Sequence, residues 1–219
     1  MLGKSYSNQK GGDVARDIFL NYCFEESKDK KLLDIGCGDG EVTLLLAKHF
    51  DYVIGIDKKI RDNEKDNVKF YTADFTEELD FLGEREIDLV ISCFNFHIMK
   101  SVEIIKGLNN IKRYMKKDGM LIFVIPNPIT FFAAFNLQNS HALYHKMTNR
   151  EIDCTIMGRD GKPNKIKYVH HTITEYLNIL EECGFKLVRS NSKKTLLMKD
   201  SFDDRNKFQN FLIIKAVCK

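Results

Sequence analysis

The sequence has few of the features that mark fibrous, disordered or membrane proteins. It contains only three prolines and 13 glycines, which excludes a collagen-like or linker-dominated chain. Its longest apolar run, Met120 to Pro126, falls far short of the ~20 residues that a membrane-spanning helix needs. The opening segment, MLGKSYSNQKGG, lacks the apolar stretch of a secretory signal. With 219 residues, of which 43% are hydrophobic, the chain is expected to fold as one domain with a substantial core.

No strong charge of one sign is present either. Lysine and arginine number 34, and aspartate and glutamate 31, which leaves a formal net charge of +3. Nucleic-acid-binding proteins usually carry a stronger and clustered basic excess, whereas the lysines here are scattered in pairs among acids. We therefore expect a solvated charged surface and no nucleic-acid partner.

The sequence also lacks the paired cysteines of metal and redox motifs. None of its six cysteines forms a Cys-x-x-Cys pair, and most lie in apolar stretches, where a free thiol behaves as a small hydrophobic group. A chain of this size has enough core to fold without disulfides. We predict reduced thiols, no metal site and a cytoplasmic protein. The cysteines are Cys23, Cys37, Cys93, Cys154, Cys183 and Cys218.

Strand and helix patterns alternate between residues 30 and 126. Short apolar runs indicate buried strands, and broader apolar faces between them indicate helices. The alternation predicts an α/β fold with a doubly wound, parallel sheet and right-handed crossovers. The second helix is expected to begin with Ser101 as its N-cap. The expected strands are 31–35, 52–57, 68–74, 87–93 and 120–125, and the expected helices are 41–50 and 101–115.

The alternation stops after residue 126. Pro126-Asn127-Pro128 cannot continue a central strand, and the stretch up to residue 170 is aromatic at first and rich in turn residues near 158–164. An excursion of this length is usually functional, as a lid or a binding subdomain. Beyond it, a helix at 172–183, capped by Thr172, precedes two closing strands at 185–188 and 211–217.

A glycine-rich loop, Leu33-Asp34-Ile35-Gly36-Cys37-Gly38-Asp39-Gly40, joins the first strand to the first helix. Its pattern is GxGxG and not the GxGxxG of dinucleotide sites. Asp34 and Asp39 would repel a pyrophosphate at the helix N-terminus, which argues against NAD and FAD. The same carboxylates suit a ligand with a positive charge, such as the ammonium group of an amino acid.

Two further acids end the next strands along the chain. Asp57 ends the second strand, where a carboxylate can accept both ribose hydroxyls of an adenosine. Asp74 ends the third strand, where it could accept the adenine amino group with Phe75 against the ring. Each acid alone is more often a surface or capping residue. Together with Asp34, at the ends of successive strands, they favour one shared ligand.

In these residues the chain resembles the class I S-adenosylmethionine-dependent methyltransferases. The resemblance covers residues 30–126 in order, through LLDIGCGDG, VIGID, TADF, IDLVISCFNFH and MKKDGMLIFVIP, and the later HHTITEYLNILEECGFKLV is similar to small-molecule members. It implies a Rossmann-like, doubly wound sheet of seven strands, with the last strand antiparallel, helices on both faces and a lid insertion. It also implies S-adenosylmethionine as cofactor and S-adenosylhomocysteine as product.

The resemblance implies roles for individual residues. Asp34, with the loop glycines, would hold the methionine end of the cofactor, and Asp57 would hold the ribose. Asp74 and Phe75 would hold the adenine, and Cys93 would line the floor of the site. The predicted cofactor-binding residues are Asp34, Gly36, Cys37, Gly38, Asp57, Lys58, Asp74, Phe75 and Cys93.

Residues 1–20 and 127–170 are expected to close over the cofactor. We divide the chain into an N-terminal helical cap (1–29), a cofactor-binding core (30–126), an acceptor-binding lid (127–170) and a C-terminal helix with closing strands (171–219). The side chains predicted to cover the cofactor lie on segments that the sheet does not need, and they are Tyr6, Phe131, Phe132 and Phe135. The alternative is a loosely ordered tail and ordinary core aromatics.

The segment after the fourth strand excludes some classes of methyl acceptor. Ser92-Cys93-Phe94-Asn95-Phe96 lacks the Asn/Asp-Pro-Pro-Tyr/Phe sequence of members that methylate the amino groups of DNA bases or glutamine. No proline precedes Cys93, as it does in cytosine C5 enzymes. We expect a small-molecule acceptor, free or carrier-bound, methylated at oxygen or nitrogen and less readily at carbon. RNA or protein methylation, and a non-catalytic S-adenosylmethionine-binding module, are the alternatives.

Histidines are the candidate bases if the acceptor must lose a proton, since their unperturbed pKa is ~6.5. His97 follows the fourth strand and His171 enters from the lid, so these two are the predicted catalytic residues. Packing or capping is the alternative role of each. The lysine-rich residues 162–168 either attract an acidic acceptor or form a solvated hairpin.

Overall fold

Seven strands form a central sheet in the order β3-β2-β1-β4-β5-β9-β8. The computed structural model describes residues 10–27, 30–60, 66–130, 144–157, 162–188 and 211–219. The parallel strands are β1 (Lys31–Ile35), β2 (Tyr52–Asp57), β3 (Val68–Thr72), β4 (Ile87–Cys93) and β5 (Met115–Pro126). β9 (Phe211–Cys218) is antiparallel to both neighbours, β5 and β8 (Phe185–Leu187). The predicted doubly wound sheet with an antiparallel last strand is therefore confirmed.

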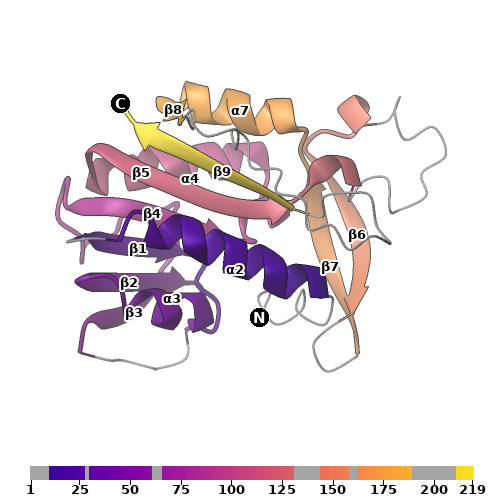
Figure 1. The fold of residues 1–219 in the computed structure, drawn as a ribbon. Coiled ribbons are helices and arrows are strands. Elements are labelled where there is room, and N and C mark those ends of the chain that lie inside the picture. The colour runs from indigo at the N-terminus through magenta and orange to yellow at the C-terminus, as the bar shows by residue number, and fades with distance from the viewer. Residues whose placement is uncertain (1–9, 28–29, 61–65, 131–143, 158–161, 189–210) are drawn as a thin grey trace.

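Helices cover both faces of this sheet (Figure 1). α2 (Lys10–Phe24) and α3 (Glu41–Leu46) share one apolar layer with strand residues such as Leu32. α4 (Ser101–Tyr114) and α7 (Ile173–Glu182) share the other layer with residues such as Leu33. The two layers form because successive side chains of a strand point to opposite faces. Burial of each large apolar side chain contributes about 1.5–3 kcal/mol, so the sheet is a rigid support for what lies at its edge.

A two-stranded hairpin stands beyond the carboxyl ends of the parallel strands (Figure 1). It consists of β6 (Arg150–Met157) and β7 (Pro163–His170), paired antiparallel with Arg150 opposite His170. β7 contacts η1, a short 3₁₀ helix (Phe96–Ile98) that follows β4. The hairpin lies within the predicted lid, and its Lys167 is exposed and pairs with Glu151 at 2.9 Å. Tyr6, Phe131, Phe132 and Phe135 lie outside the described residues.

The boundaries differ from the prediction in places where the backbone departs from regular geometry. α3 ends at Leu46, earlier than expected, and β5 already begins at Met115. Residues 116–119, expected to lie between the helix and the strand, form an irregular part of β5, where Asp118 has φ +64° and the pairing with β4 shifts register. Lys100, and not Ser101, is the N-cap of α4, and its backbone N–H donates to Glu103 Oε2 at 2.7 Å.

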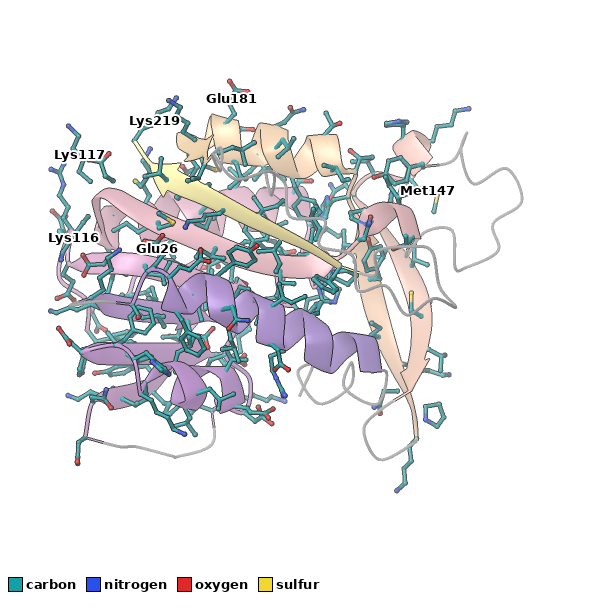
Figure 2. All side chains as sticks on the ribbon, in the orientation of Figure 1. Glu26, Lys116, Lys117, Met147, Glu181 and Lys219 are labelled. Atoms are coloured by element: carbon teal, nitrogen blue, oxygen red, sulfur yellow. The ribbon has the colours of Figure 1, made fainter. Side chains whose placement is uncertain are left out.

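The two ends of the sheet have different surroundings. Figure 2 shows Lys116 and Lys117 projecting at the end away from the hairpin, whereas Met147 lies beside the hairpin. The amino ends of the parallel strands thus lie at a solvent-exposed surface that carries these lysines, and the carboxyl ends face the hairpin. Among the described residues, no helix is long and apolar enough to cross a membrane.

Candidate active site

A cavity of about 320 Å³ opens at the carboxyl ends of β1, β2 and β4. The strand order reverses between β1 and β4, which is where ligands bind in open α/β sheets. Every predicted cofactor residue lines this cavity. The structure thus brings together Asp34, Gly36, Cys37, Gly38, Asp57, Lys58, Asp74, Phe75 and Cys93.

The glycine loop is folded tightly against β2. The backbone N–H groups of Gly36 and Cys37 both donate to the carbonyl of Ile56, at 2.8 and 3.0 Å. Gly36 has φ +72°, and a Cβ at this position would lie 2.6 Å from the side chain of Asn95. Only glycine fits there without strain. The close approach packs the backbone of the loop against the side chain of Asn95, which also lines the cavity.

Asp34 is a buried carboxylate, and one of its oxygens has no hydrogen-bond partner among the described residues. Its Oδ2 accepts a hydrogen bond from Thr43 Oγ1 at 2.7 Å, while Oδ1 has no partner among the described residues. Burial raises the pKa of Asp34 to about 7; the hydrogen bond from Thr43 opposes the rise and the nearby Asp57 adds to it. A cationic ligand would stabilise the ionised form and supply the missing partner.

Asp57 and Asp74 are held in place by backbone hydrogen bonds. Asp57 accepts from Gly38 N at 3.0 Å and from Lys59 N at 3.1 Å, one bond at each oxygen. Asp74 accepts from Thr76 N at 3.0 Å and pairs with Lys58 Nζ at 2.8 Å. Because a carboxylate oxygen can accept more than one hydrogen bond, both groups keep capacity for a ligand.

The pKa of Asp74 lies below its usual range. Partial burial opposes ionisation, but hydrogen bonds from Lys58 and Thr76 outweigh it. Phe75, next in the chain, is buried and its ring lies 6.2 Å from that of Phe96. This part of the cavity therefore combines an ionised acceptor with an aromatic wall.

The thiols in the cavity wall are neutral. Burial, followed by the charge of Asp34, raises the pKa of both Cys37 and Cys93 well above the usual range. Neither is a thiolate at neutral pH, so neither suits a nucleophilic role. They contribute apolar surface to the floor of the site.

The two predicted catalytic histidines do not line the cavity. His97 is fully buried, with its ring 6.2 Å from that of Phe94 and 5.9 Å from that of Tyr168. Burial, with a smaller contribution from His171, lowers the pKa of His97 to about 3. His171 is also fully buried. The geometry favours packing roles for both, the alternative that the sequence left open.

Several lining residues were not anticipated from the sequence. Arg16 of α2 and Glu41 of α3 face the cavity and form an ion pair at 2.9 Å. Asn95, Met99 and Glu103 form the wall that follows β4. Asn95 lies just after the end of β4, which is a signal that would have found it. Met99 follows η1, Glu103 lies in α4, and Arg16 reaches the site only through the packing of α2.

The described residues contain no cluster of His, Cys, Asp or Glu side chains that could hold a metal ion. The side chains that line the cavity include carboxylates, the guanidinium of Arg16, the ammonium of Lys58 and the amide of Asn95. This donor set suits a ligand that combines an ammonium group, hydroxyls and an aromatic base.

Comparisons with known proteins agree with this arrangement. Residues 32–119 match the methyltransferase domain family. A Geobacillus sp. (strain WCH70) protein described as a methyltransferase is 22% identical over 191 residues, covering 73% of this chain and 75% of that protein. Four other curated relatives are matched over only 43–48% of their own length.

Solved structures share the fold over nearly the whole chain. An S-adenosylmethionine-dependent methyltransferase from Listeria monocytogenes has a TM-score of 0.66 at 18% identity, over 94% of this chain and 99% of that one. The 1,6-didemethyltoxoflavin-N1-methyltransferase of Burkholderia thailandensis, solved with 1,6-didemethyltoxoflavin and S-adenosylhomocysteine, has a TM-score of 0.58 at 15% identity, over 98% and 84%.

The family match contains the glycine loop and the strand ends that build the cavity, and the solved structures share the sheet that carries them. Asp34 Oδ1, which lacks a partner among the described residues, fits a ligand that carries an ammonium group. Residues 32–119 therefore match a methyltransferase domain, and the chain has the fold of the S-adenosylmethionine-dependent methyltransferases that these structures represent.

Proposed function

We propose that this chain transfers the methyl group of S-adenosylmethionine to an oxygen or nitrogen of a small-molecule acceptor. One observation carries the cofactor half of the proposal: Asp34, Asp57 and Asp74, which end or follow neighbouring strands, share one cavity wall. Each carboxylate is matched to a different part of an adenosyl amino acid. No pair of them could be satisfied by a dinucleotide pyrophosphate.

The methionine end is assigned to the β1–α3 side of the cavity. Asp34 Oδ1 would accept from the ammonium group, and the loop at Gly36 would lie along the chain of the amino acid. Arg16, held by Glu41, would pair with the methionine carboxylate. Asp34, Arg16 and Glu41 all act electrostatically on the thiol of Cys93, so the three charges gather around one point of the floor.

The adenosine is assigned to the other side of the cavity. Asp57 is positioned by Gly38 N and would accept the ribose hydroxyls. Asp74 would accept the adenine amino group, with Phe75 beside the ring. Lys58, which already pairs with Asp74 at 2.8 Å, holds that carboxylate at the mouth of the cavity.

The protein's part in the reaction is alignment. S-adenosylmethionine supplies a methyl group on a good leaving group, so no covalent intermediate with the chain is needed. Holding two reactants in line is worth several kcal/mol, about 7–11 at best. Phe94 and Asn95, which follow β4 in the cavity wall, would form the boundary between cofactor and acceptor. The buried position of His97 supports transfer that does not depend on that side chain as a base.

The size and charge of the chain support a small acceptor. A net charge of +3 with scattered lysines offers no continuous basic stripe for RNA. The Burkholderia neighbour acts on 1,6-didemethyltoxoflavin, a small heterocycle. The hairpin β6–β7 lies at the carboxyl ends of the strands, where it would bound an acceptor pocket of modest size. Incubation with labelled cofactor and a metabolite extract tests this directly, because label in RNA or protein would contradict it.

Replacing Asp57 by alanine is expected to weaken S-adenosylhomocysteine binding about 10- to 100-fold, since charge-assisted hydrogen bonds to the ribose are worth roughly 1.5–3 kcal/mol. Isothermal titration of both proteins measures the effect. Asp51→Ala, an exposed aspartate just before β2, is the matched control and should bind like the parent. Wild-type protein that fails to bind S-adenosylhomocysteine, or binds NAD as well, would contradict the proposed function.

Replacing His97 by asparagine is expected to lower the free energy of unfolding by roughly 1–3 kcal/mol, because a buried ring is removed from between two aromatic rings. Affinity for S-adenosylhomocysteine should stay within about twofold. Thermal melting and titration of the same samples check both points. His49→Asn, at an exposed histidine, serves as control. An unchanged Tm with a turnover loss of about 10²–10⁴-fold would instead identify His97 as a base.

A further inference from the structure

Three segments meet behind one wall of the cavity. The first is η1 with the start of α4, the second is the base of the β6–β7 hairpin, and the third is the start of α7. His171 lies at the meeting point, fully buried between β7 and Thr172, the N-cap of α7. Its ring packs at 5.1 Å, edge to face, on the ring of Tyr176.

His171 holds the backbone of the cavity wall. Its Nε2 lies 2.8 Å from the carbonyl oxygen of Met99, and Met99 itself lines the cavity. A carbonyl can only accept, so Nε2 carries the proton and donates it. Burial lowers the pKa of His171 below its usual range, while the bond to Met99 opposes the shift. The ring is therefore neutral at pH 7, and Nδ1 is an acceptor.

Ser101 connects this histidine to α7 and to the hairpin. The Ser101 hydroxyl donates to Glu175 Oε1 at 3.0 Å, and Ser101 Oγ also lies 3.5 Å from His171 Nδ1. The single hydroxyl proton is thus given to the carboxylate, which explains the longer distance to the second acceptor, Nδ1. The backbone N–H of Ser101 donates to Asn149 Oδ1 at 3.0 Å. Asn149 N in turn donates to the carbonyl of His170 at the end of β7.

These contacts fasten the wall to elements that the cofactor itself does not touch. Ile98, Met99 and Glu103 line the cavity, and the residues between them are held from behind by the hairpin base and α7. The predicted role of His171 as a base does not fit this arrangement, because Nε2 is committed to Met99 and the ring is behind the wall.

We propose that His171, Ser101 and Glu175 are positioning residues that fix the Met99 wall of the cofactor cavity and couple it to the β6–β7 hairpin. The proposal rests on the proposed function, since it assigns these residues to the S-adenosylmethionine site. Coupling of this kind is reciprocal. If the hairpin base stabilises the wall in the form that binds the cofactor, then a bound cofactor stabilises the hairpin base by the same free energy.

The test is S-adenosylhomocysteine binding by Ser101→Ala, Ser101→Thr and Glu175→Gln. Ser101→Ala removes the hydroxyl–carboxylate link and is expected to raise the Kd by at least about fivefold. Glu175→Gln removes the charge and keeps an amide oxygen that can accept, so it weakens the link and should raise the Kd by a smaller factor. Ser101→Thr keeps the hydroxyl and should restore wild-type affinity. Glu181→Gln is the matched control, because this glutamate lies on the same helix and points to solvent (Figure 2). It should bind like the parent.

Two further readouts separate positioning from simple stability. Since both variants act on the same link and Ser101→Ala already removes it, the double variant should lose no more affinity than Ser101→Ala alone. Bound S-adenosylhomocysteine should also slow amide exchange at 168–171 in the wild type and not in Ser101→Ala. A lower Tm with unchanged Kd in Ser101→Ala and Glu175→Gln would overturn the proposal. Wild-type protein that does not bind S-adenosylhomocysteine at all would instead refute the function on which it rests.

Discussion

Replacing Asp34 by asparagine is expected to raise the melting temperature of the cofactor-free protein and to weaken its binding of S-adenosylhomocysteine. Both effects come from the buried carboxylate with one oxygen unpartnered among the described residues. Its pKa of about 7 in the folded protein lies well above the ~3.9 of an unfolded aspartate. Asparagine keeps an acceptor for Thr43 Oγ1 and removes the charge, so we expect a gain on the order of 1–3 kcal/mol at pH 7.

The pH dependence follows from the same shift. A group whose pKa is raised on folding stabilises the protein below its unfolded pKa, and this contribution is lost as the pH rises through the folded value. The cofactor-free protein should therefore lose stability between about pH 4 and pH 7 through Asp34. Asp34→Asn should flatten that part of the profile, as thermal melting across this pH range will measure.

Ligand affinity should change in the opposite direction. The ammonium group favours ionised Asp34, so the Kd of S-adenosylhomocysteine should fall as the pH rises from about 6 to 8, with release of a proton near pH 7. Titration in two buffers of different ionisation enthalpy reveals that proton. A pH-independent Kd in the wild type would show that Asp34 does not hold the ammonium group. An Asp34→Asn variant that melts below the wild type would show that the buried carboxylate does not destabilise the cofactor-free protein.

Replacing Gly36 by alanine should damage both stability and binding. The residue has φ +72°, and its new Cβ would meet the side chain of Asn95 at 2.6 Å. Strain and displacement together are expected to cost roughly 2–4 kcal/mol of unfolding free energy. Because Asn95 lines the cavity, its displacement should also weaken S-adenosylhomocysteine binding about tenfold or more. Chemical denaturation and titration measure the two losses.

Gly83 and Asn95 provide the controls for this variant. A Cβ on Gly83 would come no closer than 3.5 Å to Glu86, so Gly83→Ala should stay within about 0.5 kcal/mol of the parent. Adding Asn95→Ala to Gly36→Ala should recover the part of the loss that comes from contact and leave the backbone strain. If Gly36→Ala behaves like Gly83→Ala, the loop is not as constrained as its geometry indicates.

The meeting of the three aspartates in one cavity was predictable because its signals are local. Each of Asp34, Asp57 and Asp74 ends or follows a short apolar run, and parallel strands bring their carboxyl ends to one edge. The glycine loop adds a backbone conformation that few other sequences adopt. Residue type, spacing and strand direction were therefore enough to assemble one face of the site.

The remaining features depend on tertiary packing that no local pattern encodes. His97 does follow β4 as expected, but the 3₁₀ turn at 96–98 directs it into the interior. Arg16 reaches the cavity because α2 crosses the sheet, and its own helix carries no motif that marks it. The sequence predicted Ser101 as the helix N-cap, whereas the neighbouring Lys100 is the N-cap. The Ser101 hydroxyl instead donates a hydrogen bond to Glu175.

The position of β9 has a consequence for how the chain folds. This strand, at residues 211–218, lies inside the sheet between β5 and β8, and Lys215 pairs with Glu26 at the end of α2. All strands that carry the cofactor edge precede it in the sequence, so they are synthesised while the other half of the sheet still lacks its central strand. Pairing across so large a sequence separation is slow. We expect the insertion of β9 to limit the rate of folding, with the β5 edge exposed to association with other chains until it occurs.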